Sequence, residues 1–170
     1  LSSTDKQTIL DGGVYYHKLK NKFYSFNCGR KITEFNKGFI QAAELLPTRG
    51  LAIPLRVIRE IGVFDARNFP QAASDYDFTL RAREKGYRLI VDYSCRIYSE
   101  NDFGLTPLNT RMSLPQFLRS FSDIKSSYHL RTFLRFGIKH FKQYKLFIPV
   151  YLMRLLLGPA RTYLTSLMKK

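Results

Sequence analysis

The chain has 170 residues, which leaves room for one domain or for part of one with an appendage. Hydrophobic residues make up 45% of it and aromatic residues 15%, which excludes a disordered chain because disordered segments lack the apolar surface that folding needs. The formal net charge is +15, and residues 101–170 carry 12 of the 28 basic residues but 2 of the 13 acidic ones. Because this last segment is both basic and apolar, it favours an anionic lipid surface over a nucleic acid as its partner.

The cysteines and histidines indicate neither a metal site nor a disulfide framework. Cys28 and Cys95 lie far apart and form no CxxC pair, and the three histidines lack ligand-like spacing. We therefore predict no metal-binding residues in this chain, and two buried or unreactive thiols in a reducing compartment. Residues 1–5 contain neither an initiator Met nor the start of a signal peptide, so we expect the chain to begin within a longer protein.

The first part of the chain is rich in strand-forming sequence. Residues 8–26 contain β-rich runs separated by turn residues at 11–13 and 20–22, a pattern typical of hairpins. Residues 27–47 are irregular and rich in Gly, Asn and Lys, which predicts a surface loop.

A short helix is predicted after an apolar run at residues 51–53. Pro54 suits its first turn because the missing N–H of proline would be unpaired there. Gly62 is expected to end the helix in a left-handed conformation, since glycine accepts that backbone geometry. Phe64 would then enter the core.

A second helix is predicted to begin at Ser74 or Asp75 and to end before Gly86. Residues 88–98 are rich in β-branched and aromatic side chains, which predicts a strand. The local order of strand, helix and strand favours an α/β layer.

The last third of the chain has a helical pattern. Residues 114–124 follow Ser113 and have Pro115 in the first turn, and residues 127–144 carry an apolar stripe with helical spacing. Residues 146–157 are almost wholly apolar but fall short of the roughly 20 residues that a membrane span requires. We expect this segment to be a helix in the membrane interface.

The most informative stretch is residues 49–89. It begins with a glycine before an apolar run, a basic pair on a short helix and the sequence "G-x-F-D" at the end of that helix. An acidic pair at the start of the next helix and the sequence "R-x-x-x-x-G-Y" follow. These elements are Gly50, Arg56 and Arg59, Gly62 to Asp65, Ser74 to Asp77, and Arg81 to Tyr87. In order and spacing they resemble the acceptor-side segment of family 2 glycosyltransferases. The later sequence SSYHLRTFLRFGIKHF resembles the helix that follows the catalytic domain in many members.

The resemblance implies a fold and an activity. The fold class would be α/β: residues 1–105 would be the C-terminal half of a GT-A-like nucleotide-diphospho-sugar transferase domain with a mixed sheet edge, and residues 106–170 a basic, α-helical, membrane-associated tail. The activity would be hexosyl-type and inverting, with transfer of a sugar from a nucleotide sugar to a glycan or a lipid-linked acceptor. The protein would be cytoplasmic and peripheral on the inner face of the plasma membrane.

The resemblance also assigns roles to single residues. Asp75 would be the general base that removes the proton of the acceptor hydroxyl. Arg49, Gly50, Ser74 and Asp77 would bind substrate, and Asp77 would orient either the acceptor or neighbouring basic groups. A helix N-terminus stabilises a carboxylate, so Asp75 would be ionised at neutral pH. The alternative is that Asp75 is a simple helix cap, because Ser and Asp are common at helix starts.

The chain departs from the family pattern at two positions. Ser74 replaces the usual Glu, and Ser99 stands where the family often has a His that can bind metal. The Asp-x-Asp pair that holds Mg²⁺ or Mn²⁺ on the nucleotide of the complete enzyme belongs to an N-terminal half that has no counterpart in this sequence. The fragment alone is therefore expected to be inactive.

Two other classes of protein compete with the enzyme. A non-catalytic module that binds membrane surfaces would use the same tail but would not need the Asp75 carboxylate. A nucleic-acid-binding protein is suggested by the pI of about 10.0 alone, and no RNA- or DNA-binding motif accompanies it, so we expect no nucleic-acid partner.

Overall fold

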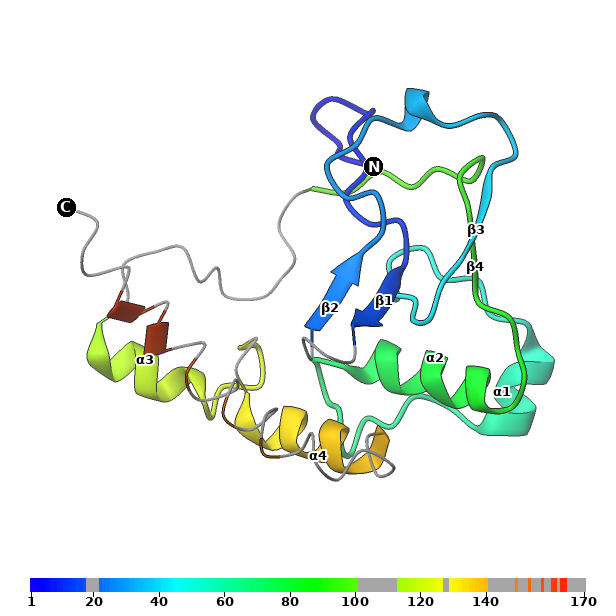
Figure 1. Ribbon diagram of the computed structural model, residues 1–170. Coiled ribbons are helices and arrows are strands. Elements are labelled where there is room, and N and C mark those ends of the chain that lie inside the picture. Colours follow the sequence, from blue (N-terminus) through cyan, green and yellow to red (C-terminus); the bar gives the residue numbers. More distant parts are fainter. Residues whose placement is uncertain are drawn as a thin grey trace. The chain divides into compact units, whose positions relative to one another are not determined.

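The computed structural model describes residues 1–17, 22–100, 113–126 and 129–140, and single positions between 149 and 164 (Figure 1). The chain forms two compact units: unit 1 comprises residues 1–64 and 75–103, and unit 2 comprises residues 65–74 and 104–170. The described residues form a mixed α/β structure with four α-helices and small antiparallel sheets. The predicted boundary between residues 105 and 106 lies outside the described residues.

The first sheet of unit 1 is a hairpin of β1 (Val14–His17) and β2 (Lys22–Ser25), which pair in antiparallel register with Val14 opposite Ser25 (Figure 1). Tyr15 and Tyr24 face each other across it and stack with their ring centroids 5.3 Å apart. The hairpin predicted within residues 8–26 is thus confirmed, although residues 18–21 between its strands lie outside the described residues.

The second sheet pairs β3 (Ile40–Ala42) with β4 (Ile90–Asp92), also antiparallel. Three predictions fail here. The loop expected at residues 27–47 contains both β3 and the 3-10 helix η1 (Ile32–Glu34). The strand expected at residues 88–98 is cut to three residues because Asp92 accepts a 2.8 Å hydrogen bond from the Ser94 N–H and turns the chain. The described sheets are antiparallel, whereas a mixed sheet was expected.

Two helices, α1 (Leu55–Ile61) and α2 (Ser74–Glu84), pack around a core of Val57, Phe78 and Ala82. Both follow the predicted boundaries. Pro54 is extended and immediately precedes α1, and Gly86 has a positive φ of 90° just after α2. Glycine is favoured there because it adopts positive φ without a steric penalty.

The end of α1 differs in detail from the prediction. Gly62 has the expected positive φ of 77°, but its ψ is −175°, so the backbone is not left-handed helical. The chain instead bends at Val63, whose carbonyl oxygen accepts a hydrogen bond from Arg81. Phe64 stacks on Phe78 with centroids 4.6 Å apart but is only half-buried.

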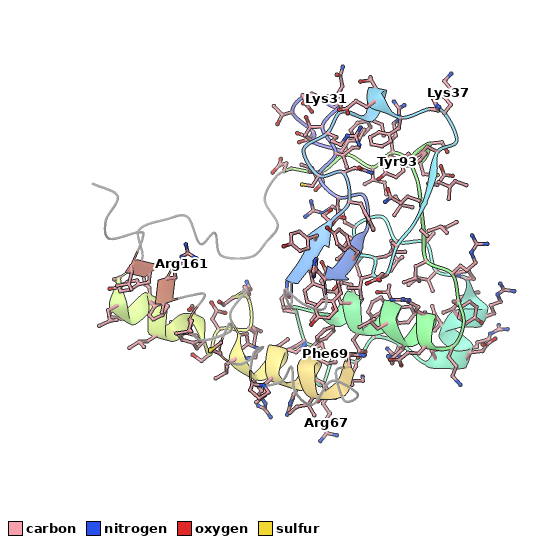
Figure 2. The ribbon with its side chains drawn as sticks, viewed as in Figure 1. Lys31, Lys37, Arg67, Phe69, Tyr93 and Arg161 are labelled. Atoms are coloured by element: carbon pink, nitrogen blue, oxygen red, sulfur yellow. The ribbon has the colours of Figure 1, made fainter. Side chains whose placement is uncertain are left out.

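A second core cluster of unit 1 consists of Ile9, Ile32 and Tyr93, and Figure 2 shows Tyr93 among the side chains beside β3 and β4. The Tyr93 hydroxyl accepts a 2.7 Å hydrogen bond from the Asn27 amide and donates one of 3.1 Å to Gln41. The buried hydroxyl is therefore paired with side chains from two other segments of the chain.

In unit 2, α3 (Leu114–Ser120) begins with a capping box, in which the Ser113 hydroxyl accepts from the Gln116 N–H and the Gln116 side chain accepts from the Ser113 N–H. The predicted start is confirmed, and the helix ends four residues before the predicted position. α4 (Leu130–His140) lies within the predicted helix at 127–144, of which 141–144 are outside the described residues.

The predicted interfacial segment at 146–157 lies almost entirely outside the described residues. Within the part of the chain that the structure describes, no helix combines the length and the apolar character needed to cross a membrane.

Candidate functional site

Asp75 lies in the first turn of α2, at its second residue. Its carboxylate accepts a 3.2 Å hydrogen bond from the Thr48 N–H, which is distant in sequence, and one of 2.9 Å from the Tyr76 N–H. A residue that simply caps the helix would precede the first turn and accept from the second or third N–H of the helix. The observed bonds instead join the carboxylate to another segment.

Burial raises the pKa of Asp75 above its ordinary value, the hydrogen bonds from Thr48 and Tyr76 oppose the rise, and the charge of Asp11 adds to it. The sequence predicted that the helix N-terminus would stabilise the ionised form. In the folded protein the loss of hydration has the larger effect. Asp75 is therefore a stronger proton acceptor than an exposed aspartate, which is the direction that general-base catalysis requires.

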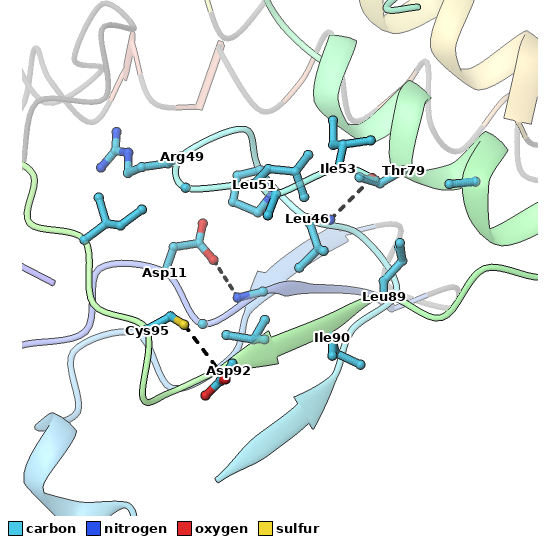
Figure 3. A pocket seen from close by; sticks show the side chains of 18 of the residues that line it. Asp11, Leu46, Arg49, Leu51, Ile53, Thr79, Leu89, Ile90, Asp92 and Cys95 are labelled. Carbon is cyan, nitrogen blue, oxygen red and sulfur yellow. Dashed lines mark hydrogen bonds between the residues drawn. The ribbon is translucent and has the colours of Figure 1, made fainter. Parts of the chain in front are cut away.

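A cleft of about 930 Å³ lies in unit 1 next to this segment (Figure 3). In Figure 3, Arg49 and Leu51 lie on one wall, and Leu89 and Ile90 lie on the opposite wall. The predicted substrate-binding residues Arg49 and Gly50 thus both line the cleft. Asp75 does not line it, but it is bonded to Thr48, the residue directly before Arg49.

The wall that carries Arg49 is fixed to α2 at two points. The Thr48 N–H binds Asp75, and the Leu46 N–H donates a 3.3 Å hydrogen bond to the Thr79 hydroxyl, which is drawn in Figure 3. Gly50 has a φ of +80°, and a Cβ there would overlap Ile97 Cδ1. The positive φ therefore favours glycine at this position of the cleft wall, and Ile97 Cδ1 would have to move to admit a larger residue.

Asp77, the second carboxylate of the motif, is fully buried and does not line the cleft. Its Oδ2 lies 2.9 Å from Nε of Arg81, one turn later on α2. The Arg81 guanidinium also donates to the carbonyl oxygens of Ile61 and Val63. Asp77 thus pairs with a neighbouring basic group, and the role toward the acceptor that was expected for it stays a prediction.

Ser74 begins α2, and its hydroxyl lies 3.5 Å from the Gln71 carbonyl oxygen, to which it donates. The residue before it, Ala73, has a φ of 64°, which is uncommon outside glycine. The Ser74 hydroxyl is thus directed back to the preceding loop and stabilises the turn into α2.

Sequence reasoning missed Asp11, which it treated only as a turn residue. Asp11 lines the cleft, and its Oδ1 accepts a 2.9 Å hydrogen bond from the Gly13 N–H, drawn in Figure 3. The same oxygen accepts a second bond, also of 2.9 Å, from the Ser25 hydroxyl. Its charge raises the pKa of Asp75 and adds to the effect of burial on Tyr76. No local signal could have found this, because Asp11 and Asp75 are brought together only by the fold.

Among the described residues, no group of three or more His, Cys, Asp or Glu side chains could hold a metal ion. Cys28 and Cys95 are both free thiols, and both are exposed rather than buried. Cys95 lines the cleft, with its Sγ 3.9 Å from Asp92.

The chain matches no protein-family model, and comparison with curated proteins and with solved structures finds no significant similarity. A functional interpretation therefore rests on the motif residues and on their geometry.

Proposed function

We propose that the chain is the acceptor-side portion of an inverting, hexosyl-type glycosyltransferase of family 2, with Asp75 as the general base. What supports this most is that Asp75 is bonded to the residue directly before the motif residues Arg49 and Gly50. The Thr48 N–H holds the Asp75 carboxylate, and the next two residues line the cleft. The substrates are a nucleotide sugar and a glycan or lipid-linked acceptor.

In an inverting transfer, the acceptor hydroxyl attacks the anomeric carbon from the face opposite the leaving nucleotide, and a carboxylate removes the hydroxyl proton. Burial suits Asp75 to this role, because it raises the pKa of the carboxyl group and so its affinity for the proton. The Thr48 and Tyr76 N–H groups fix the direction of the two carboxylate oxygens.

Mg²⁺ or Mn²⁺ is the metal that the family uses at the nucleotide diphosphate. The described residues of this chain do not supply a fitting ligand set, so we derive no step through a metal here. The GT-A-like fold of residues 1–105 belongs to the same proposal.

We further propose that residues 106–170 bind an anionic membrane surface, peripherally on the cytoplasmic face of the plasma membrane. The described part of this tail exposes large apolar side chains, namely Leu114, Leu118, Ile124, Ile138, Met153, Leu157 and Leu164. Apolar surface among many positive charges is typical of interfacial helices. The competing possibility is a membrane-binding module without catalysis.

The enzyme is tested with protein expressed from the complete reading frame that contains this chain. Labelled UDP-, GDP- and dTDP-sugars are supplied with membranes as the acceptor source, and incorporated label is measured. Asp75→Asn should lower transfer by about 10²–10⁴-fold, which is typical for loss of a general base. The matched control is Asp92→Asn, which changes a carboxylate that lines the cleft and is bonded to Ser94. If the Asp75→Asn variant transfers sugar at the parental rate, the assignment of Asp75 as the general base is wrong. That result would favour a membrane-binding module without catalysis.

A further inference from the structure

The cleft of unit 1 has two chemically different ends, and its volume of about 930 Å³ is within the range of small-molecule sites. Charged side chains lie toward one end in Figure 3, namely Arg49, Asp11 and Asp92. Apolar side chains lie toward the other end, namely Leu46, Ile53, Leu89 and Ile90. A molecule that fills the cleft therefore meets charged groups at one end and an apolar surface at the other.

The apolar end is in contact with solvent. Leu46, Leu51 and Leu89 are each half-buried, and Ile90 on β4 is 46% exposed. Covering such side chains with hydrocarbon is favourable, because it removes apolar surface from water on both sides of the contact. This end of the cleft therefore fits an alkyl chain.

The polar end offers both hydrogen-bond donors and acceptors. Arg49 lines it, and so does Arg96, which directly follows Cys95 at this end of Figure 3. Guanidinium groups only donate, whereas the ionised carboxylates of Asp11 and Asp92 only accept. The two positive and two negative side chains balance one another, so a head group without net charge fits. Sugar hydroxyls match this end, since each hydroxyl both donates and accepts.

Asp11 is oriented to accept a hydrogen bond from such a ligand. Both of its bonds, from the Gly13 N–H and from the Ser25 hydroxyl, go to Oδ1. Its Oδ2 accepts no hydrogen bond from the described residues. The two internal bonds thus fix the carboxylate and leave one oxygen for a ligand hydroxyl. Hydrogen bonds to an ionised carboxylate are stronger than those between neutral groups.

We propose that the cleft binds a glycolipid, with the uncharged sugar head group at Asp11 and Arg49 and the alkyl chain along Leu51. Arg49 directly follows Thr48, whose N–H binds the Asp75 carboxylate, and all of these residues belong to unit 1. The role of this glycolipid as the acceptor rests on the proposed function. Within that function, the proposal selects the lipid-linked acceptor over a free glycan.

The first experiment titrates the full chain with octyl, decyl and dodecyl β-D-glucoside below their critical micelle concentrations. Binding is followed at the methyl resonances of Ile53 and Leu89, which line the cleft, so that ligand bound elsewhere on the protein does not contribute. Affinity should rise about fourfold for each CH₂ group that enters the cleft. Equal affinities for the three glucosides, or no change in these resonances with dodecyl glucoside, would overturn the proposal.

A second experiment tests the apolar end. Leu51→Gln should lower the affinity for dodecyl glucoside about tenfold, because it places an amide against the alkyl chain. Leu51 lies outside both core clusters of unit 1, so the variant should fold. The matched control is Leu55→Gln, the same change at a side chain that is 69% exposed and does not line the cleft. Equal affinities of these two variants would contradict a chain bound along Leu51.

A third experiment tests the polar end with Asp11→Asn. Asparagine keeps an oxygen for the Gly13 N–H and the Ser25 hydroxyl but replaces the second oxygen with a donor. Affinity for dodecyl glucoside should fall about tenfold, whereas affinity for dodecyl phosphate at the same resonances should not fall. An equal loss for both ligands, or tighter binding of dodecyl phosphate than of dodecyl glucoside to the parent, would rule out an uncharged sugar head group.

The binding experiments do not require sugar transfer. If the complete protein transfers no sugar but the glucosides bind as expected, the proposed function fails and the cleft is still a glycolipid site. If the protein transfers sugar but the cleft resonances do not respond to the glucosides, the glycolipid site fails and the proposed function stands.

Discussion

The Nε of Arg81 lies 2.9 Å from the carboxylate of the buried Asp77. The same guanidinium donates hydrogen bonds to the carbonyl oxygens of Ile61, at the end of α1, and of Val63, two residues later. One cation thus links α2 to the carbonyl oxygens of Ile61 and Val63. The two carboxylates at the start of α2 therefore have different roles. Asp77 holds two helices together, and Asp75 faces the segment that borders the cleft.

Asp77→Ala is expected to lower the free energy of unfolding by about 3 kcal/mol, because removal of one partner leaves a partly buried guanidinium without its counter-charge. Urea unfolding measures the change. Asp92→Ala, which removes a less buried carboxylate, should cost much less. A loss below about 1 kcal/mol in Asp77→Ala would contradict the structural role of this pair.

Asp75→Asn is expected to stabilise the fold at neutral pH while it abolishes transfer. Because the pKa of Asp75 is raised in the folded state, folding favours the protonated carboxyl group. Its contribution to stability is complete below the unfolded-state pKa of 3.8 and is lost as the pH rises through the folded-state value. The neutral amide avoids this loss, so the variant should be more stable than the parent at pH 7.

Urea unfolding at several pH values checks this expectation. The stability difference between the two proteins should be smallest near pH 3 and grow toward pH 7. A difference that is constant over this range would show that the Asp75 pKa is not raised in the folded protein.

Gly50→Ala should destabilise the chain more than Gly38→Ala does. The two glycines have nearly equal φ values, +80° and +78°, so the backbone penalty is matched. A Cβ at residue 50 would also overlap Ile97, whereas nothing lies within 4 Å of one at residue 38. We expect about 1 kcal/mol for the backbone alone, and a smaller additional loss at residue 50 because the overlapping atom is the end of the half-exposed Ile97 side chain, which can move. Equal losses in thermal or urea unfolding would show that the cleft wall adapts.

The tail should bind vesicles that contain anionic lipid. Positive residues surround its apolar segment, and each contributes about 1 kcal/mol near an anionic leaflet. These residues are Lys139, Lys142, Lys145, Arg154, Arg161, Lys169 and Lys170. In sedimentation assays, binding should grow with anionic lipid content, weaken in high salt and vanish when residues 146–170 are deleted.

A variant with the basic residues after 145 changed to Gln, and all apolar residues kept, is the matched control and should lose the dependence on lipid charge. Absent binding, or binding that is indifferent to lipid charge, would favour packing of the tail against another part of the protein.

The sequence by itself determined the local elements. Gly62 and Gly86 marked the ends of α1 and α2, Ser113 marked the start of α3, and the turn residues at 20–22 predicted a hairpin. Each of these features depends on the backbone preferences of a few consecutive residues, so a single sequence contains the information.

Which elements and side chains contact one another depended on the tertiary structure alone. The pairing of β3 with β4, the effect of the Asp11 charge on Asp75 and the ion pair of Lys139 with Asp65 all join residues that are distant in the chain. The raised pKa of Asp75 also depends on the tertiary structure. A helix N-terminus is visible in the sequence and favours the charged carboxylate, but the burial that outweighs it depends on which segments pack over the residue.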